Sequence, residues 1–242
     1  MSEASSGSNV EFAGIPATRQ FDLQRSDDFS YVCNRCKRCC HNKAIPLNPY
    51  EVVRLAHRLG VSTGEFIEQS TLGGEGTFLR FHPPEEGGAC VFLGEEGCSV
   101  HSDRPTACRV YPLGRWSAGP GVEAFARVDP EPGSLGVYGS AGTVGDFLKG
   151  QGVEPYFEAA ERYVELFTRL ADVSELVEKG ELDAAGLPDG NWLDVDSVVG
   201  EHCAGRGLTP PADPDALTRL HIEIIEGWLD AIKPGAYSLP PA

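Results

Sequence analysis

Four cysteines stand close together early in the chain, as Cys33, Cys36, Cys39 and Cys40 in the pattern C-x-x-C-x-x-C-C. A C-x-x-C pair can direct two thiolates toward one metal ion, and it recurs in zinc and iron–sulfur sites. A third cysteine two residues further on extends the pair toward a ferredoxin-type run. Because the side chains of adjacent cysteines tend to diverge, we expect Cys39 and Cys40 to have different roles.

A second group of candidate ligands follows about fifty residues later, as Cys90, Cys98, His101 and Cys108. Together the two groups offer seven thiols and one imidazole, all soft or borderline donors. Such a set suffices for one four-ligand site with spare residues or for two sites. Neither group has four well-placed thiols of its own, so we predict that a complete site draws on both.

The predicted sulfur separations depend on what is bound. The sulfurs of Cys33, Cys36 or Cys39 should lie near at least one cysteine of the second group. For a shared zinc ion they should be roughly 4 Å apart, given Zn–S bonds of about 2.3 Å. For a cubane cluster they should be roughly 6–7 Å apart, because each thiolate binds a different iron.

Basic residues surround both groups, although the protein as a whole is acidic. They are Arg35, Lys37, Arg38, Lys43, Arg104 and Arg109. Cations lower thiol pKa values and offset the negative charge of a thiolate-bound centre. The C-x-x-C-x-x-C run and these cations favour an iron–sulfur cluster or iron over zinc. The eighth cysteine, Cys203, follows His202 far from the others, and we interpret it as a buried structural thiol.

The composition limits the classes of function. The chain has 242 residues, 41% of them hydrophobic, and a formal net charge of −16. This charge disfavours nucleic-acid binding and anionic membranes. No apolar run approaches the roughly 20 residues of a membrane span, and the polar start is unlike a secretory signal. We therefore expect a cytoplasmic protein whose partner is another protein or a substrate of unknown identity.

The secondary-structure signals indicate an α+β fold. Capping boxes and apolar residues at helical spacing predict helices over 49–60, 62–69, 155–180 and 214–232. Short β-rich runs predict strands between Thr77 and Val128, with Cys90 and Cys98 flanking a hairpin. Residues 129–143 are predicted to be a loop, and residues 181–212 to be irregular. We expect a mobile tail over 1–28, a cysteine-cluster metal-binding domain over 29–128 and a mainly helical C-terminal extension over 129–242.

The combined motif resembles the YkgJ-type CxxCxxCC cysteine-cluster family. The resemblance covers roughly residues 30–115, including the segment CVFLGEEGCSVHSDRPTACRVYP. It implies a zinc- or iron-chelating domain, and part of the family resembles flagellin lysine N-methylase. Several relatives carry a further Cys-Pro-Gly after the strand region, whereas this chain has Asp129-Pro130-Glu131-Pro132-Gly133.

These observations predict a small metal-stabilised domain followed by C-terminal helices. The leading function is an iron–sulfur or iron/zinc protein with a redox or protein-modifying role. A structural zinc module that serves as an interaction surface is the first alternative. A protein lysine N-methylase, by family analogy alone, is the second. The sequence assigns no reaction, because it contains no recognisable cofactor motif.

Overall fold

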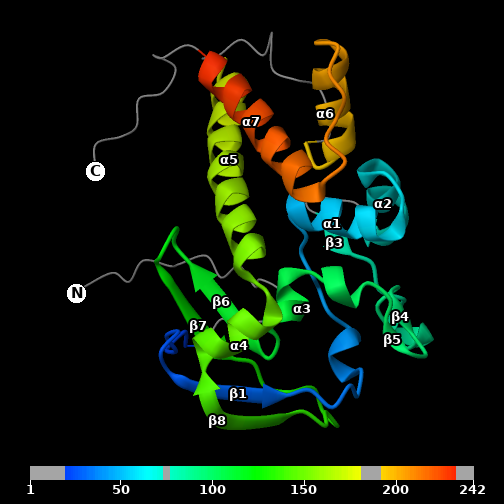
Figure 1. The fold of residues 1–242 in the computed structure, drawn as a ribbon, viewed down its shortest axis with the longest axis vertical. Helices are drawn as coiled ribbons and strands as arrows, with labels where there is room; N and C mark the ends of the chain where they lie inside the picture. Colours follow the sequence, from blue (N-terminus) through cyan, green and yellow to red (C-terminus); the bar gives the residue numbers. More distant parts are fainter. Residues whose placement is uncertain (1–19, 73–76, 181–191, 233–242) are drawn as a thin grey trace. The chain divides into compact units, whose positions relative to one another are not determined.

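A computed structural model describes residues 20–72, 77–180 and 192–232 of the chain (Figure 1). Short antiparallel strand pairs and helices alternate in it, and helices dominate the C-terminal part. The predicted α+β class is therefore confirmed. The contacts divide the chain into two compact units. One comprises the described residues of Met1–Pro46 and Phe78–Glu154, and the other those of Leu47–Thr77 and Pro155–Ala242.

The first unit contains three antiparallel strand pairs. Strand β1 (Asp28–Val32) pairs with β8 (Val137–Thr143), β4 (Leu93–Gly94) with β5 (Gly97–Cys98), and β6 (Leu113–Ser117) with β7 (Glu123–Arg127). The β4–β5 hairpin matches the turn expected between Cys90 and Cys98. Its two-residue strands provide little stability by themselves, since short isolated hairpins are marginal in water.

Short helices complete this unit. They are α3 (Thr106–Val110), α4 (Val144–Gln151) and the 3-10 turns η1 (Arg38–Cys40), η2 (Pro84–Glu86) and η3 (His101–Asp103), with β3 (Phe78–Leu79) before η2. Phe29 of β1 is 1% exposed and packs edge-on against Phe147 of α4, with ring centroids 5.0 Å apart. This apolar contact fixes α4 on the β1–β8 pair.

The second unit is helical. Its elements are α1 (Pro49–Leu59), α2 (Thr63–Ser70), the short strand β2 (Thr71–Leu72), α5 (Glu154–Glu178), α6 (Val195–Ala204) and α7 (Pro214–Ala231). The capping boxes predicted at Asn48 and Ser62 are both formed, and Gly60 ends α1 with a φ of 71°. A positive φ costs glycine little, which explains why the helix stops there.

Apolar side chains from α1, α5 and α7 form the main core of the helical unit, including Tyr50, Tyr163 and Ile225. Cys203 of α6 is 1% exposed in a neighbouring cluster, so its interpretation as a buried thiol is confirmed. Thr63 joins α2 to α6: its hydroxyl donates to Asp194 Oδ1 at 2.7 Å and accepts from the backbone N–H of Asp196 at 2.9 Å.

Two sequence expectations are wrong. Residues 129–143 are not all loop, because β8 occupies 137–143 and pairs with β1. The expected irregular stretch contains α6, while residues 181–191 lie outside the described part. Both elements depend on partners distant in sequence, which local patterns do not reveal.

The domain boundaries expected from the sequence stay a prediction, because contact-based units need not be independently folding domains. Residues 1–19 of the expected tail lie outside the described part, whereas Leu23 forms a β-bridge with Phe125. Within the described ranges, no helix combines the length and apolar character required for a membrane span.

Candidate metal centre

The cysteine loop, residues 33–40, follows β1 directly. Residues 33–37 belong to no helix or strand, and η1 completes the loop. Arg35 and Lys37 have φ angles of 52° and 64°, which are uncommon for residues that carry a side chain. The Lys37 carbonyl accepts a hydrogen bond from the Cys40 backbone N–H at 3.0 Å. The left-handed Lys37 thus turns the chain so that Cys39 and Cys40 follow on a tight 3-10 turn.

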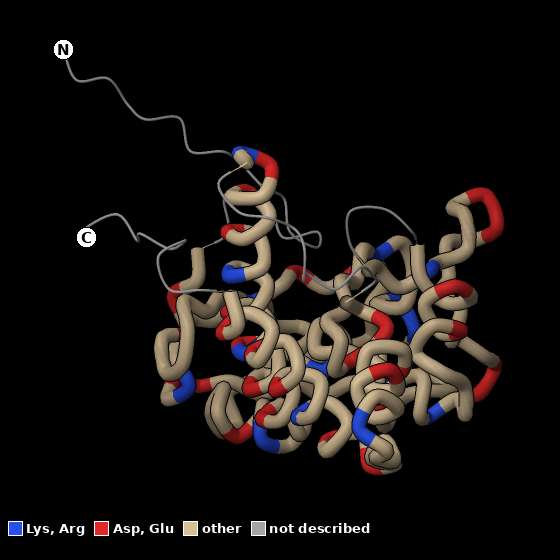
Figure 2. The backbone as a smooth tube through the Cα atoms, turned by 90° about the horizontal axis from the view of Figure 1, so that it is seen from above, with Lys and Arg blue, Asp and Glu red and all other residues tan. Residues whose placement is uncertain are grey.

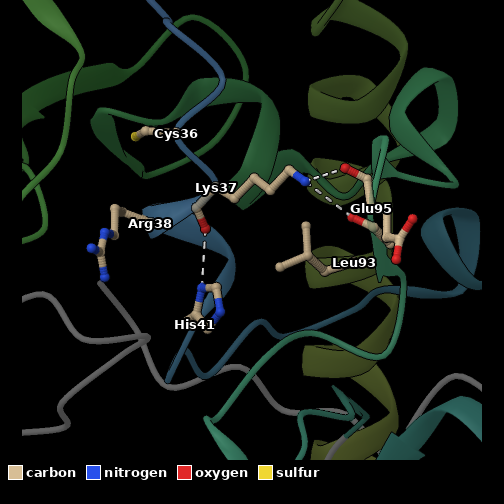
Figure 3. Close-up of a pocket in the computed structure, with 7 residues that line it drawn as sticks. Cys36, Lys37, Arg38, His41, Leu93 and Glu95 are labelled. Carbon is tan, nitrogen blue, oxygen red and sulfur yellow. Dashed lines mark hydrogen bonds between the residues drawn. The ribbon is translucent and has the colours of Figure 1, made fainter.

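An open pocket separates this loop from the β4–β5 hairpin (Figure 3). Lys37 extends across it, and its Nζ donates to the backbone carbonyls of Gly94, at 3.3 Å, and Glu95. His41 lies on the loop side with Nδ1 3.1 Å from the Lys37 carbonyl oxygen. Cys36 and Arg38 point away from the side on which Lys37 meets the hairpin. The lysine therefore connects the two segments that bear the cysteine groups.

The adjacent cysteines Cys39 and Cys40 converge. Their sulfurs are 4.0 Å apart, which is close to the separation of two thiolates on one tetrahedral zinc ion. The expected divergence of vicinal side chains is therefore wrong here. A hydrogen bond from the Cys40 thiol lowers the pKa of Cys39 to about 7, with help from the Lys43 charge. The same bond, burial and neighbouring thiolates raise the pKa of Cys40.

Four half-buried thiols influence one another's pKa values, and Cys36 and Cys108 adjoin the same group. Cys40 interacts with Cys39 and Cys90. Cys90 interacts with Cys98, and Cys98 interacts with Cys39. We call Cys39, Cys40, Cys90 and Cys98 the ring thiols. The two sequence groups meet at the backbone bond between Cys90 and Cys40, and the expected sulfur separations stay a prediction.

Backbone hydrogen bonds position the second half of this set. The Cys90 N–H donates to the Cys40 carbonyl at 2.8 Å, and Phe81 forms a β-bridge with Cys90. Cys98 pairs with Leu93 in the β4–β5 hairpin. Burial is the main reason that the pKa values of Cys90 and Cys98 are raised. These two thiols therefore hold their protons at neutral pH until a metal displaces them.

Cys33 and Cys36 lie on the outer part of the loop. Cys33 is exposed, and the Cys36 sulfur accepts a hydrogen bond from the Leu135 N–H at 3.4 Å. The Ser134 hydroxyl lies 3.9 Å from the same sulfur. The Leu135 N–H is the largest of the influences that lower the pKa of Cys36. Cys36 thus differs from Cys90 and Cys98, whose pKa values burial raises.

Cys108 and His101 occupy the edge of the cluster. Cys108 is exposed on α3, yet its charge reaches Cys40. His101 is exposed on η3, and its pKa is lowered by partial burial and then by the charges of Arg104 and Arg109. Arg104 also donates to the His101 carbonyl at 2.7 Å. The neighbours of His101 are therefore positively charged, which opposes its protonation.

The role of each flanking cation is visible in its contacts. Arg109 is 7% exposed and donates to the backbone carbonyls of Ser102, Arg104 and Gln151, which is a structural role. Lys43 forms an ion pair with Glu131. Acidic and basic positions occur along much of the chain (Figure 2), so the cations at the cysteine loop lie in a mixed-charge setting.

Sequence reasoning missed the contribution of residues 131–135. This segment contains no cysteine, but Glu131 pairs with Lys43 while Ser134 and Leu135 contact Cys36. The contacts join residues almost one hundred positions apart, and no local pattern signals them. His41 was also missed, although its place directly after Cys40 could have identified it as a candidate donor.

The described residues contain no three or more Cys, His, Asp or Glu side chains already arranged to hold a metal ion. The ligand assignments for Cys33, Cys36, Cys39, Cys40, Cys90, Cys98, His101 and Cys108 accordingly stay predictions. The donor chemistry fits zinc or iron, because half-buried thiols beside cations are the ligands that both metals accept.

Comparison with known proteins identifies one family. Residues 32–127 match the model of the CxxCxxCC family, which is described as a "Putative zinc- or iron-chelating domain". The match spans every candidate ligand and confirms the resemblance seen in the sequence. No curated protein and no solved structure matches the chain. The family description supports metal binding, with zinc or iron as the metal.

Proposed function

From the CxxCxxCC domain in residues 32–127, we propose that the chain binds one zinc or iron ion through the ring thiols. The observation that supports this choice is the 4.0 Å contact between the Cys39 and Cys40 sulfurs, beside which the Cys90 N–H donates to the Cys40 carbonyl at 2.8 Å. Four thiolates complete a tetrahedral site. Cys39 and Cys40, with sulfurs 4.0 Å apart, would hold the ion together with Cys90 and Cys98.

The ion would connect the cysteine loop to the β4–β5 hairpin. In the protein without metal, the link between them includes the Cys90–Cys40 backbone bond and the Lys37 side chain. Binding of a structural metal contributes on the order of 10 kcal/mol to folding. The ring site therefore acts first as a structural centre that orders a segment rich in turns.

An iron–sulfur cluster is the second candidate. The N–H···S bond from Leu135 to Cys36 supports it, because such bonds are typical around cluster thiolates and tune their potentials. In that arrangement Cys33, Cys36 and Cys39 would be the first ligands, and the redox role expected from the sequence would follow. The 4.0 Å contact between Cys39 and Cys40 favours the mononuclear site. We also propose a cytoplasmic location, because a reducing compartment keeps the cysteines that bind no metal as thiols.

Metal analysis of single-cysteine variants tests the proposal. Wild-type protein, purified without oxygen, should contain about one zinc or iron per chain and no acid-labile sulfide. Cys90→Ala or Cys98→Ala should remove most of the metal, whereas Cys33→Ala and Cys36→Ala should retain it. Cys203→Ala is the matched control, because Cys203 is buried in the helical unit.

Cobalt titration covers variants that fold poorly. Four thiolates around cobalt give intense thiolate-to-metal absorption, and replacing one thiol weakens it. If wild-type protein instead contains iron with stoichiometric sulfide, and Cys33→Ala or Cys36→Ala removes both, the centre is an iron–sulfur cluster and the ring site is refuted. Folded wild-type protein that binds neither metal would refute metal binding altogether.

A further inference from the structure

The β1–β8 strand pair has one packed face and one solvent-exposed face. On the packed face, Tyr31 of β1 lies opposite Tyr138 of β8, and their rings meet edge to face with centroids 5.3 Å apart. The next pair along the ladder is Val32 and Val137. Because side chains alternate along a strand, these two valines point to the opposite face.

That solvent-exposed face is aliphatic. Val32 is 59% exposed and Val137 is 58% exposed, and Leu135, two residues before Val137, is 61% exposed. The Asn34 side chain donates to the Leu135 carbonyl at 2.6 Å, which holds Leu135 beside the end of β1. The solvated face of an antiparallel pair is ordinarily polar, and exposed apolar residues that gather in one place mark an interaction site. We call Val32, Leu135 and Val137 the aliphatic patch.

Arginine side chains border the aliphatic patch. The Arg38 guanidinium lies beside Gly133, where Arg38 Nε is 3.7 Å from the position that a Cβ would occupy, and Gly133 is two residues from Leu135. Arg35 and Arg38 are exposed and form no ion pair within the described part of the chain. The nearby carboxylate of Glu131 is already paired with Lys43. The patch therefore adjoins positive charge that no carboxylate of the described residues neutralises.

The combination limits what can cover this face. A second copy fits poorly, because a two-fold interface would bring the same arginines of both chains together, and each chain has a net charge of −16. A nucleic acid would be repelled by that net charge, and its phosphates would leave the aliphatic patch without an apolar partner. A polypeptide with carboxylates next to apolar side chains satisfies both halves of the surface.

From this arrangement we infer that the aliphatic patch, with Arg35 and Arg38, binds a short segment of a partner protein in which Asp or Glu stands beside aliphatic or aromatic residues. The apolar side chains of the segment cover Val32, Leu135 and Val137, and its carboxylates pair with the guanidinium groups. The net charge of −16 repels extended acidic surfaces, so the carboxylates of the partner are few and lie at the arginines.

The probe is a random peptide library displayed on phage and selected on full-length, metal-loaded protein. Selected peptides should combine acidic with apolar residues, and a polyglutamate peptide should not bind. Fluorescence anisotropy of one labelled, selected peptide then measures affinity. Val137→Ser and Leu135→Ser should each weaken binding about tenfold, as expected for the burial of one aliphatic side chain. Val122→Ser, at another exposed valine, should match the wild type.

A double-mutant cycle tests the charge pairing. Arg38→Gln should weaken binding several-fold, and changing Glu to Gln in the peptide should then cost little further affinity. Arg58→Gln, at an exposed position of α1, is the matched control. Full additivity of Arg38→Gln and every Glu-to-Gln change in the peptide would overturn the assigned pairing.

Further outcomes decide against the inference. Selected peptides that are basic, a library that yields no binder, or binding that Val137→Ser and Leu135→Ser leave unchanged would overturn it. A dimer in analytical ultracentrifugation that Val137→Ser dissociates would give the patch to a second copy and would also overturn it.

Metal content and circular dichroism of the same samples separate this inference from the ring site. Folded protein without metal that binds the peptide would refute the ring site and retain the docking surface. Metal-loaded protein that binds no peptide would refute the docking surface alone.

Discussion

The buried pair His221 and Tyr163 makes the stability of the helical unit depend on pH. His221 of α7 is fully buried, and its Nδ1 lies 2.9 Å from the Tyr163 hydroxyl of α5. The Trp192 backbone acts against burial on the pKa of His221, but the effect of burial is larger. Burial lowers the pKa of His221 to about 4.

The sign and size of the effect follow from the two pKa values. In the unfolded chain the histidine titrates at its ordinary value of 6.5. Between pH 6.5 and about 4 the unfolded state binds more protons, so acid favours unfolding. The contribution is fully present above pH 6.5 and is lost as the pH falls toward 4. At 1.36 kcal/mol per pKa unit, the total loss is about 3 kcal/mol.

Denaturant unfolding of His221→Gln and wild-type protein at pH 7.5, 5.5 and 4.5 measures this effect. Hydrogen exchange of α5 and α7 amides assigns the change to the helical unit. Other groups titrate in both proteins, so the difference between their pH profiles isolates His221. His57→Gln, at an exposed position of α1, is the control. Parallel profiles for wild type and His221→Gln would refute the reasoning.

Three further outcomes are expected. Thr63→Val should lower the free energy of unfolding by about 1–3 kcal/mol, because it removes the two hydrogen bonds that the buried Thr63 hydroxyl makes with Asp194 Oδ1 and the Asp196 N–H. Denaturant unfolding measures the change, and exposed Thr168→Val should change little. Removal of the metal by a chelator should accelerate hydrogen exchange in β4 and β5 but not in α7, as mass spectrometry can detect. Ser134→Ala should slow alkylation of Cys36 less than tenfold, since it removes one weak hydrogen bond to the thiolate; unchanged or faster alkylation would contradict this role.

Helices whose signals are local could be predicted from the sequence. The capping box of Asn48 and Glu51, followed by an apolar stripe and Gly60, predicted α1 close to its observed bounds. α5 and α7 were predicted equally well, because their apolar residues recur at helical spacing over many turns. In each case the information lies within the segment itself.

Strand β8 shows why other elements could not be predicted. Its sequence contains Gly139 and Gly142, which have low β propensity. The strand forms because β1 offers a partner more than one hundred residues away, with Tyr31 opposite Tyr138. Helix α6 is similar, since the contacts of Thr63 with Asp194 and Asp196 fix its start.

The candidate site was predicted in outline but not in detail. Ligand spacing predicted that the two cysteine groups meet, and the backbone bond from Cys90 to Cys40 joins them, whereas the choice of ligands stays a prediction. Spacing could not show which thiols have raised and which have lowered pKa values, because burial and hydrogen bonding decide this. Those properties come from the β4–β5 hairpin and from residues 131–135, both distant in sequence from the first motif.

The division of the cysteines follows from competition between burial and hydrogen bonding. Cys90 and Cys98 accept backbone N–H groups, but burial dominates and raises their pKa values. Cys36 accepts a similar bond from Leu135 with little burial, so its pKa falls. A lower pKa makes a thiol easier to ionise, and ionisation is what both metal binding and nucleophilic attack require. Similar hydrogen bonds therefore accompany opposite pKa shifts, because the thiols differ in how deeply they are buried.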